Sequence, residues 1–142
     1  MEAPDLRPDS RFWRASGKTV LLNPRLAGAP NIREFHRAMD DAGLNGHVVF
    51  ATSGSTGSPK FACISIEALL ASAGMVNRHL AATREDVWLC ALPVFHVGGF
   101  GICARAHVAG GQVSMLRGPW SPRHFVEQAA TSGATISSLV PT

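Results

Sequence analysis

The chain has 142 residues, a formal net charge of +3, 46% hydrophobic residues and 16% charged residues. This length fits one domain or part of one, and the apolar content excludes an intrinsically disordered chain. No apolar run approaches the roughly 20 residues of a membrane-spanning helix, and the N-terminal residues lack the apolar core of a signal peptide, so we expect a cytoplasmic protein.

Two parts with different patterns follow one another. Residues 1–46 are irregular and interrupted by prolines, with a short extended piece expected at Lys18–Leu22 and a helix at Asn31–Ala42. Residues 47–142 alternate apolar runs with amphipathic segments, which predicts part of an α/β domain: a parallel sheet with right-handed crossovers. The elements expected there are strands at His47–Thr52 and Phe61–Ser65, a helix at Ile66–Ala82, a strand at Asp86–Leu92, a loop at Phe95–Gly101 leading into a helix that ends near Ala109, a strand at Gln112–Leu116, a helix from Ser121 to about Thr131, and a strand at Ala134–Val140.

Local signals support several of these elements. Ser121 and Pro122 have the types expected at a helix N-cap and first turn. In the Ile66–Ala82 helix, apolar side chains recur at helical spacing at Leu69, Ala73, Val76 and Leu80. Outside this helix, we expect three large side chains in the core: Trp88, Leu92 and Phe100.

The three cysteines and the basic residues give no strong functional signal. Cys63, Cys90 and Cys103 form no C-x-x-C pair, and we expect them to be reduced and buried. The basic residues are scattered, which gives no pattern typical of nucleic-acid binding.

The most informative segment is TSGSTGSPK, residues 52–60, which lies between two expected strands. Glycines let a backbone approach a ligand closely, hydroxyl and N–H groups donate to phosphate oxygens, and a lysine neutralises their charge. The segment is not a P-loop, because Gly57 follows Gly54 too soon and Phe61 follows Lys60. It does not fit G-x-S-x-G or S-x-x-K either. On composition alone, a solvated turn explains it as well as a phosphate site does.

This segment resembles the phosphate-binding signature of the adenylate-forming (AMP-binding) superfamily, which includes acyl-CoA synthetases, luciferases and peptide-synthetase adenylation domains. LPVFH at 92–96 is similar to a second signature of those enzymes, and the glycine pair 110–111 and SLVPT at 138–142 match their order. The resemblance covers about Val48–Thr142. It implies that the phosphates of ATP are contacted by Thr52, Ser53, Gly54, Ser55, Thr56, Gly57 and Lys60. It also implies that Thr56 is a ligand of the magnesium ion.

Within the superfamily, WLCALPVFHVGGFGICAR is most similar to the o-succinylbenzoate–CoA ligases of menaquinone biosynthesis. That resemblance implies that Arg105 contacts a substrate carboxylate, a task that suits a permanently charged, bidentate guanidinium. It also implies that His96, the candidate catalytic residue, gates the junction of phosphate and acyl sites, beside Gly98 and Gly99. Gly98 stands where related ligases often have serine. The alternative for Arg105 is an exposed arginine on a helix. The alternative for His96 is a core or loop histidine that is hydrogen-bonded to a backbone carbonyl.

The implied chemistry has two steps. A carboxylate attacks the α-phosphorus of Mg²⁺–ATP to give an acyl-adenylate and pyrophosphate, and coenzyme A then displaces AMP. The family's downstream adenine, ribose and catalytic-lysine signatures do not occur before Thr142. We therefore expect an N-terminal fragment, inactive alone, that exposes sheet surface and oligomerises or pairs with a missing C-terminal portion. The alternatives are another enzyme of the superfamily, a non-catalytic nucleotide- or phosphate-binding relic, and a structural fragment.

Overall fold

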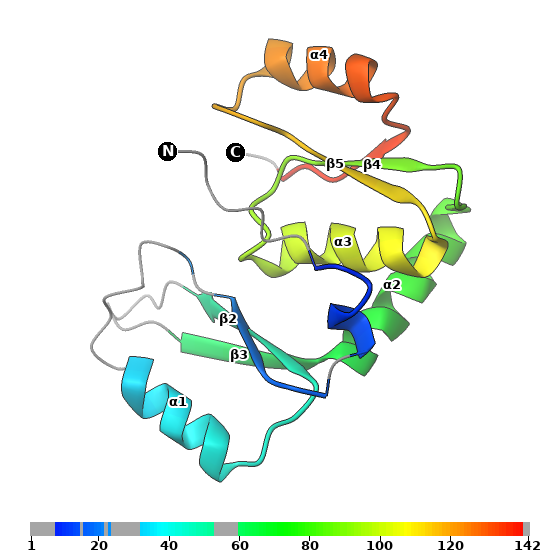
Figure 1. Cartoon of the computed structure of the whole chain (residues 1–142). Helices are drawn as coiled ribbons and strands as arrows, with labels where there is room; N and C mark the ends of the chain where they lie inside the picture. The colour runs from blue at the N-terminus through cyan, green and yellow to red at the C-terminus, as the bar shows by residue number, and fades with distance from the viewer. Residues whose placement is uncertain (1–7, 15, 22, 24–31, 53–59, 141–142) are drawn as a thin grey trace.

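The structure is a computed structural model that describes residues 8–14, 16–21, 23, 32–52 and 60–140 (Figure 1). The expected cap of the first helix, Asn31, lies outside these residues. The elements of the first half are a 3-10 turn η1 (Phe12–Arg14), β1 (Thr19–Leu21), α1 (Ile32–Asp41), β2 (His47–Thr52) and β3 (Lys60–Ser65). Those of the second half are α2 (Ile66–Leu80), β4 (Val87–Cys90), α3 (Val97–Ala109), β5 (Gln112–Met115), α4 (Pro122–Ser132) and β6 (Ile136–Ser137).

The strands form two three-stranded sheets. One has the order β5-β4-β6 with both neighbours parallel to β4, which confirms the predicted parallel α/β arrangement. The other has the order β1-β2-β3, in which β1 is parallel and β3 antiparallel to β2. The antiparallel pair departs from the all-parallel expectation. Its physical reason is the short connection 53–59, because a parallel crossover needs a dozen or more residues.

Helix α3 is the centre of the molecule. Figure 1 shows α3 between the two sheets, with α4 on the opposite face of β5-β4-β6 and α1 on the far side of β1-β2-β3. The Phe100 ring of α3 lies 5.7 Å from Phe50 of β2, 5.5 Å from Phe12 and 5.4 Å from Trp13, between ring centroids. Phe100 and Trp88 are buried as expected, whereas Leu92 is half-buried. This aromatic cluster holds η1 and the β1-β2-β3 sheet against α3, and Trp88 of β4 belongs to the same buried core.

Two expected elements differ from the structure by more than two residues at one end. The segment Phe95–Gly101 is not a loop, because α3 already begins at Val97; tertiary packing outweighs the low helix propensity of its glycines. The expected strand Ala134–Val140 shortens to β6, since Ser137 pairs with Leu89 and β4 ends one residue later at Cys90.

Burial also corrects two expectations for side chains. Cys90 and Cys103 are buried free thiols, but Cys63 is exposed on β3, which is an edge strand of the described sheet. In α2, Leu69 is buried as expected, whereas Leu80 is exposed and the polar Asn77 is buried in the interface with α3.

Candidate functional site

The two ends of the glycine-rich segment lie side by side in the sheet. Thr52, the last residue of β2, pairs with Lys60, the first residue of β3, and the Thr52 hydroxyl donates to the Lys60 carbonyl oxygen over 3.3 Å. Both side chains are exposed. The pairing fixes the two ends of a seven-residue connection, 53–59, at one edge of the sheet. The predicted ligands Ser53, Gly54, Ser55, Thr56 and Gly57 lie outside the described residues.

Helix α1 supports the lysine end of this connection. The Phe35 ring stacks on Phe61, next to Lys60, with centroids 3.8 Å apart and planes at 17°. An ion pair between Lys18 and Asp40 joins α1 to the segment before β1. The stacked rings limit how far β3 can shift against α1, so the backbone of Lys60 has a defined position.

The second predicted signature forms the start of α3. His96 is the N-cap residue, with extended backbone (φ −108°, ψ 148°), and its exposed side chain makes no cap hydrogen bond. No acidic residue occupies the first turn. The free N–H groups and the helix dipole at such an end favour an anion. The imidazole therefore stands beside a positively polarised helix end.

The glycines that follow His96 have different roles. A Cβ on Gly99 would lie 2.3 Å from the Pro93 carbonyl oxygen, so only glycine fits without a backbone shift. A Cβ on Gly98 would lie 3.3 Å from Leu92 Cδ1, a tight contact with a flexible side chain. The absence of a side chain at Gly99 lets the start of α3 pack closely against the Pro93 backbone in the loop after β4, which sets the position of His96. Gly98 leaves the surface next to His96 without a side chain.

Arg105 lies further along α3 and is half-buried. Its Nη2 atom lies 3.6 Å from the position that a Cβ of Gly101 would take, so the guanidinium extends back toward the His96 end of the helix. Burial lowers the pKa of Arg105 below its ordinary value. Among the described residues, no acidic side chain forms an ion pair with it. A partly desolvated cation of this kind is suited to a carboxylate ligand.

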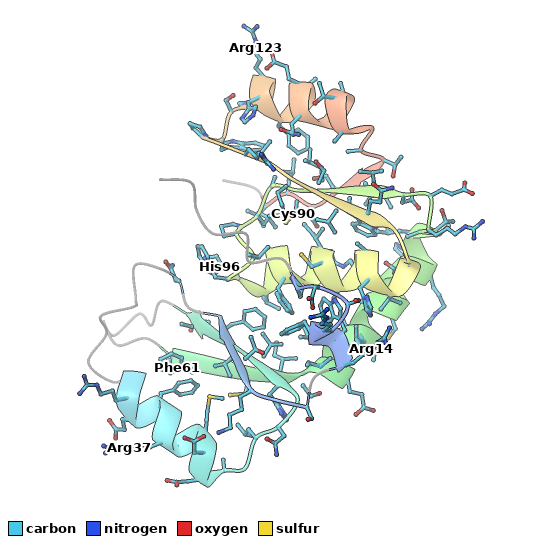
Figure 2. All side chains as sticks on the ribbon, in the orientation of Figure 1. Arg14, Arg37, Phe61, Cys90, His96 and Arg123 are labelled. Atoms are coloured by element: carbon cyan, nitrogen blue, oxygen red, sulfur yellow. The ribbon has the colours of Figure 1, made fainter. Side chains whose placement is uncertain are left out.

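These parts face one side of the molecule. In Figure 1 the end of β2, the start of β3 and the start of α3 lie on the same side of the view, and Figure 2 shows the His96 side chain there. The carboxyl end of β4 leads to the same place, which is where α/β sheets bind ligands. A separate hollow of about 490 Å³, lined by Trp13, Cys103 and His107 among others, includes none of the predicted site residues.

Sequence reasoning missed one polar residue near the site. The Asn77 amide donates from Nδ2 to the Arg105 carbonyl oxygen over 2.8 Å. Its signal was present, since positions 69, 73 and 77 continue one helix face, but a polar side chain broke the apolar pattern.

The described residues contain no group of three or more side chains that could hold a metal ion. Within the described part of the chain, no helix is long and apolar enough to span a membrane.

Comparison with known proteins identifies similar sequences. The chain is 33% identical over 94 residues to a 2-succinylbenzoate–CoA ligase of Enterococcus faecalis, covering 66% of this chain and 19% of the relative. It is 42% identical over 91 residues to the Escherichia coli enzyme of that name, covering 64% and 19%. The chain therefore spans about a fifth of the length of the curated relatives that it matches.

Solved structures give a consistent result. The o-succinylbenzoate coenzyme A synthetase of Bacillus subtilis in complex with ATP and magnesium ion matches with a TM-score of 0.55 and 27% identity, over 63% of this chain and 24% of that chain. The same enzyme with its acyl-adenylate intermediate matches with a TM-score of 0.58 and 28% identity, over 65% and 24%. Residues 35–142, most of the chain, match the family described as AMP-binding enzyme, and the chain belongs to that family.

Proposed function

We propose that this chain supplies the phosphate-binding and acid-binding part of an ATP-dependent acid–CoA ligase whose acid is 2-succinylbenzoate. Relatives of that name and the family match support the reaction class. The observation that carries the substrate assignment is Arg105, half-buried and without an acidic partner among the described residues. An acid with a second carboxylate can bind this cation while its first carboxylate reacts.

The proposed roles follow from position and charge. Lys60 contacts the β- and γ-phosphates of ATP. The Thr52 hydroxyl, which donates to the Lys60 carbonyl oxygen in this structure, turns its proton to a phosphate oxygen, and the segment between them adds further donors. Their exposed places at paired strand ends fit a charged ligand approaching from solvent. Mg²⁺, when bound at Thr56, neutralises phosphate charge. His96 and the start of α3 lie at the junction of the two substrates, where negative charge develops.

In the first step, an oxygen of the substrate carboxylate forms a bond to the α-phosphorus and the bond to pyrophosphate breaks. In the second, the thiolate sulfur of coenzyme A attacks the acyl carbon and AMP leaves with the bonding electron pair. The described residues contribute to the first step by binding and orienting both reactants. Correct orientation alone can supply about 7–11 kcal/mol of a barrier between two bound reactants.

The test is a grafted ligase, in which residues 47–142 replace the matching segment of the Escherichia coli enzyme. Arg105→Ala is expected to raise KM for 2-succinylbenzoate by about 10-fold or more, because a charge-assisted hydrogen bond contributes about 1.5–3 kcal/mol. KM for ATP should stay within about two-fold on the same reasoning. The control is Arg123→Ala, which removes an exposed arginine paired with Glu127. Equal changes in both KM values, or none, would reject the assignment.

A further inference from the structure

Asn77 is the one buried polar or charged residue among those that the structure describes, with 7% of its surface exposed. Its Nδ2 atom donates to the Arg105 carbonyl oxygen at 2.8 Å, across the interface between α2 and α3. Its Oδ1 atom is buried and has no hydrogen-bond partner in the described structure. A buried acceptor without a partner is unfavourable, and a leucine, which has the same number of side-chain heavy atoms, would avoid it. Packing alone therefore does not explain the amide.

The hydrogen bond ends at the residue whose side chain is proposed to bind the acid. A carbonyl oxygen has two acceptor sites, so the Arg105 carbonyl can bond to Asn77 and still take part in its own helix. The bond fixes how far α3 is rotated and shifted along α2 at that residue. The guanidinium leaves the helix at the same point and lies over Gly101. Its place therefore depends on the helix register that Asn77 sets.

Asn77 also lies on the connection between the phosphate-binding end of the site, at Lys60, and the acid-binding end, at Arg105. Lys60 begins β3, and Ser65 ends it; the Ser65 hydroxyl accepts from the Ala68 N–H over 3.1 Å, so α2 starts directly after the strand. Asn77 lies about three turns further along α2. Strand, cap and helix thus form one continuous connection from Lys60 to the Arg105 carbonyl. The spacing between the phosphate end and the acid end is set along this connection.

We propose that Asn77 is a positioning residue, which holds the Arg105 guanidinium at the correct distance from the phosphate-binding end of the site. This inference rests on the function proposed for Arg105. Misplacing a binding group by about 1 Å can reduce the rate about 100-fold, so a modest change of helix register has a measurable effect. Asn77 itself contacts neither substrate in this account.

The experiment compares Asn77→Leu, Asn77→Asp and Leu69→Ala in the 142-residue chain, by calorimetric binding of 2-succinylbenzoate and by thermal unfolding. Asn77→Asp keeps the shape and removes the donor. Leu69→Ala is the matched control, because Leu69 lies on the same helix with the same 7% exposure and its truncation loosens packing without touching the hydrogen bond. The grafted ligase carries the same three substitutions for KM measurements.

We expect both Asn77 variants to bind 2-succinylbenzoate about 10-fold more weakly and to raise its KM alone, with KM for ATP unchanged. Leu69→Ala should lower Tm and leave both KM values in place. Unchanged acid binding in Asn77→Leu, an equal loss in Leu69→Ala, or loss of folding in Asn77→Leu would overturn the proposal. If the parent chain or grafted ligase shows no acid binding that Arg105→Ala weakens, the proposed function itself fails, which distinguishes the two.

Discussion

Helices α3 and α4 lie on opposite faces of the same sheet and are built in opposite ways (Figure 1). Helix α4 has standard ends: the Ser121 hydroxyl accepts from the His124 N–H, Pro122 follows, and Gly133 closes the helix with φ 64°. Yet α4 contains no buried residue. Helix α3 lacks a side-chain cap and has glycines in its first turns, but six of its residues are buried.

The difference separates what starts a helix from what holds it. Capping groups satisfy the free N–H and C=O groups at helix ends, and each contributes about 1 kcal/mol. Burial of an aromatic or aliphatic side chain contributes about 1.5–3 kcal/mol and depends on the rest of the fold. His96 and Arg105 of the candidate site lie at the start and in the middle of the helix that is held by burial. Their backbone positions are therefore fixed by packing on two sheets rather than by local sequence.

The largest difference between the helices should come from aromatic truncation. Phe100→Ala in α3 removes a fully buried ring in contact with Phe50 and Trp13, and we expect a loss of about 3–5 kcal/mol in the free energy of unfolding. Phe125→Ala in α4 removes a half-buried ring, with an expected loss of about 1 kcal/mol. Urea unfolding measures both. Similar losses would mean that the two helices are held in the same way.

Glycine substitution tests the backbone of the two helices. Gly99→Ala should cost about 1–3 kcal/mol, because the new methyl would meet the Pro93 carbonyl oxygen and the start of α3 must shift. Gly133→Ala places alanine in a left-handed conformation at the end of α4, at about 1 kcal/mol. The Gly99 variant alone should also change the His96 environment, seen as a shift of its imidazole NMR signals. An unshifted His96 would contradict the positioning role of Gly99.

Removal of the N-cap side chain should affect α4 and leave α3 unchanged. Ser121→Ala deletes the hydroxyl that caps α4, with an expected loss of about 1 kcal/mol confined to that helix. His96→Ala deletes no cap hydrogen bond, so the amides of α3 should keep their protection from hydrogen exchange. Hydrogen-exchange rates measured for the backbone amides of each helix test both expectations. Faster exchange throughout α3 in the His96 variant would show a capping role that the geometry does not include.

The smallest expected effect concerns pH. His107, in the last turn of α3, stacks on Trp13 at 5.2 Å, and burial together with the nearby Arg14 charge lowers its pKa below the ordinary value of 6.5. The unfolded chain then binds the proton more readily, so stability should decrease as pH falls below 6.5. Unfolding at pH 7.5 and about 5.5 measures the loss, and His107→Gln should reduce it. An undiminished pH dependence in that variant would contradict the assignment.

Much of this architecture could be predicted from the sequence because the relevant signals are local. Ser121 and Pro122 predicted the start of α4, and the β-branched run of β2 predicted that strand with its bounds. The start of α3 could not be predicted in this way, since Gly98 and Gly99 look like loop residues until Gly99 is seen against the Pro93 carbonyl. The partial burial of Arg105 likewise depends on packing that brings distant segments together.

The site was predictable in part for the same reason. The glycine-rich segment was correctly placed between two strands, but the antiparallel pairing that brings Thr52 next to Lys60 was not predicted. Asn77 was not singled out, because its partner is a backbone carbonyl 28 residues away in sequence. A contact of that kind leaves no mark in a helical apolar pattern other than one polar residue where an apolar one is expected.

The most direct test of the central claim is ATP–pyrophosphate exchange by the grafted ligase that contains residues 47–142. We predict exchange that requires 2-succinylbenzoate and that Lys60→Ala reduces by about 10- to 100-fold, because one charge-assisted phosphate contact contributes about 1.5–3 kcal/mol. Exchange by Lys60→Ala at the parent rate, or ATP binding by the grafted ligase with no exchange at all, would contradict the claim that this segment serves acid activation.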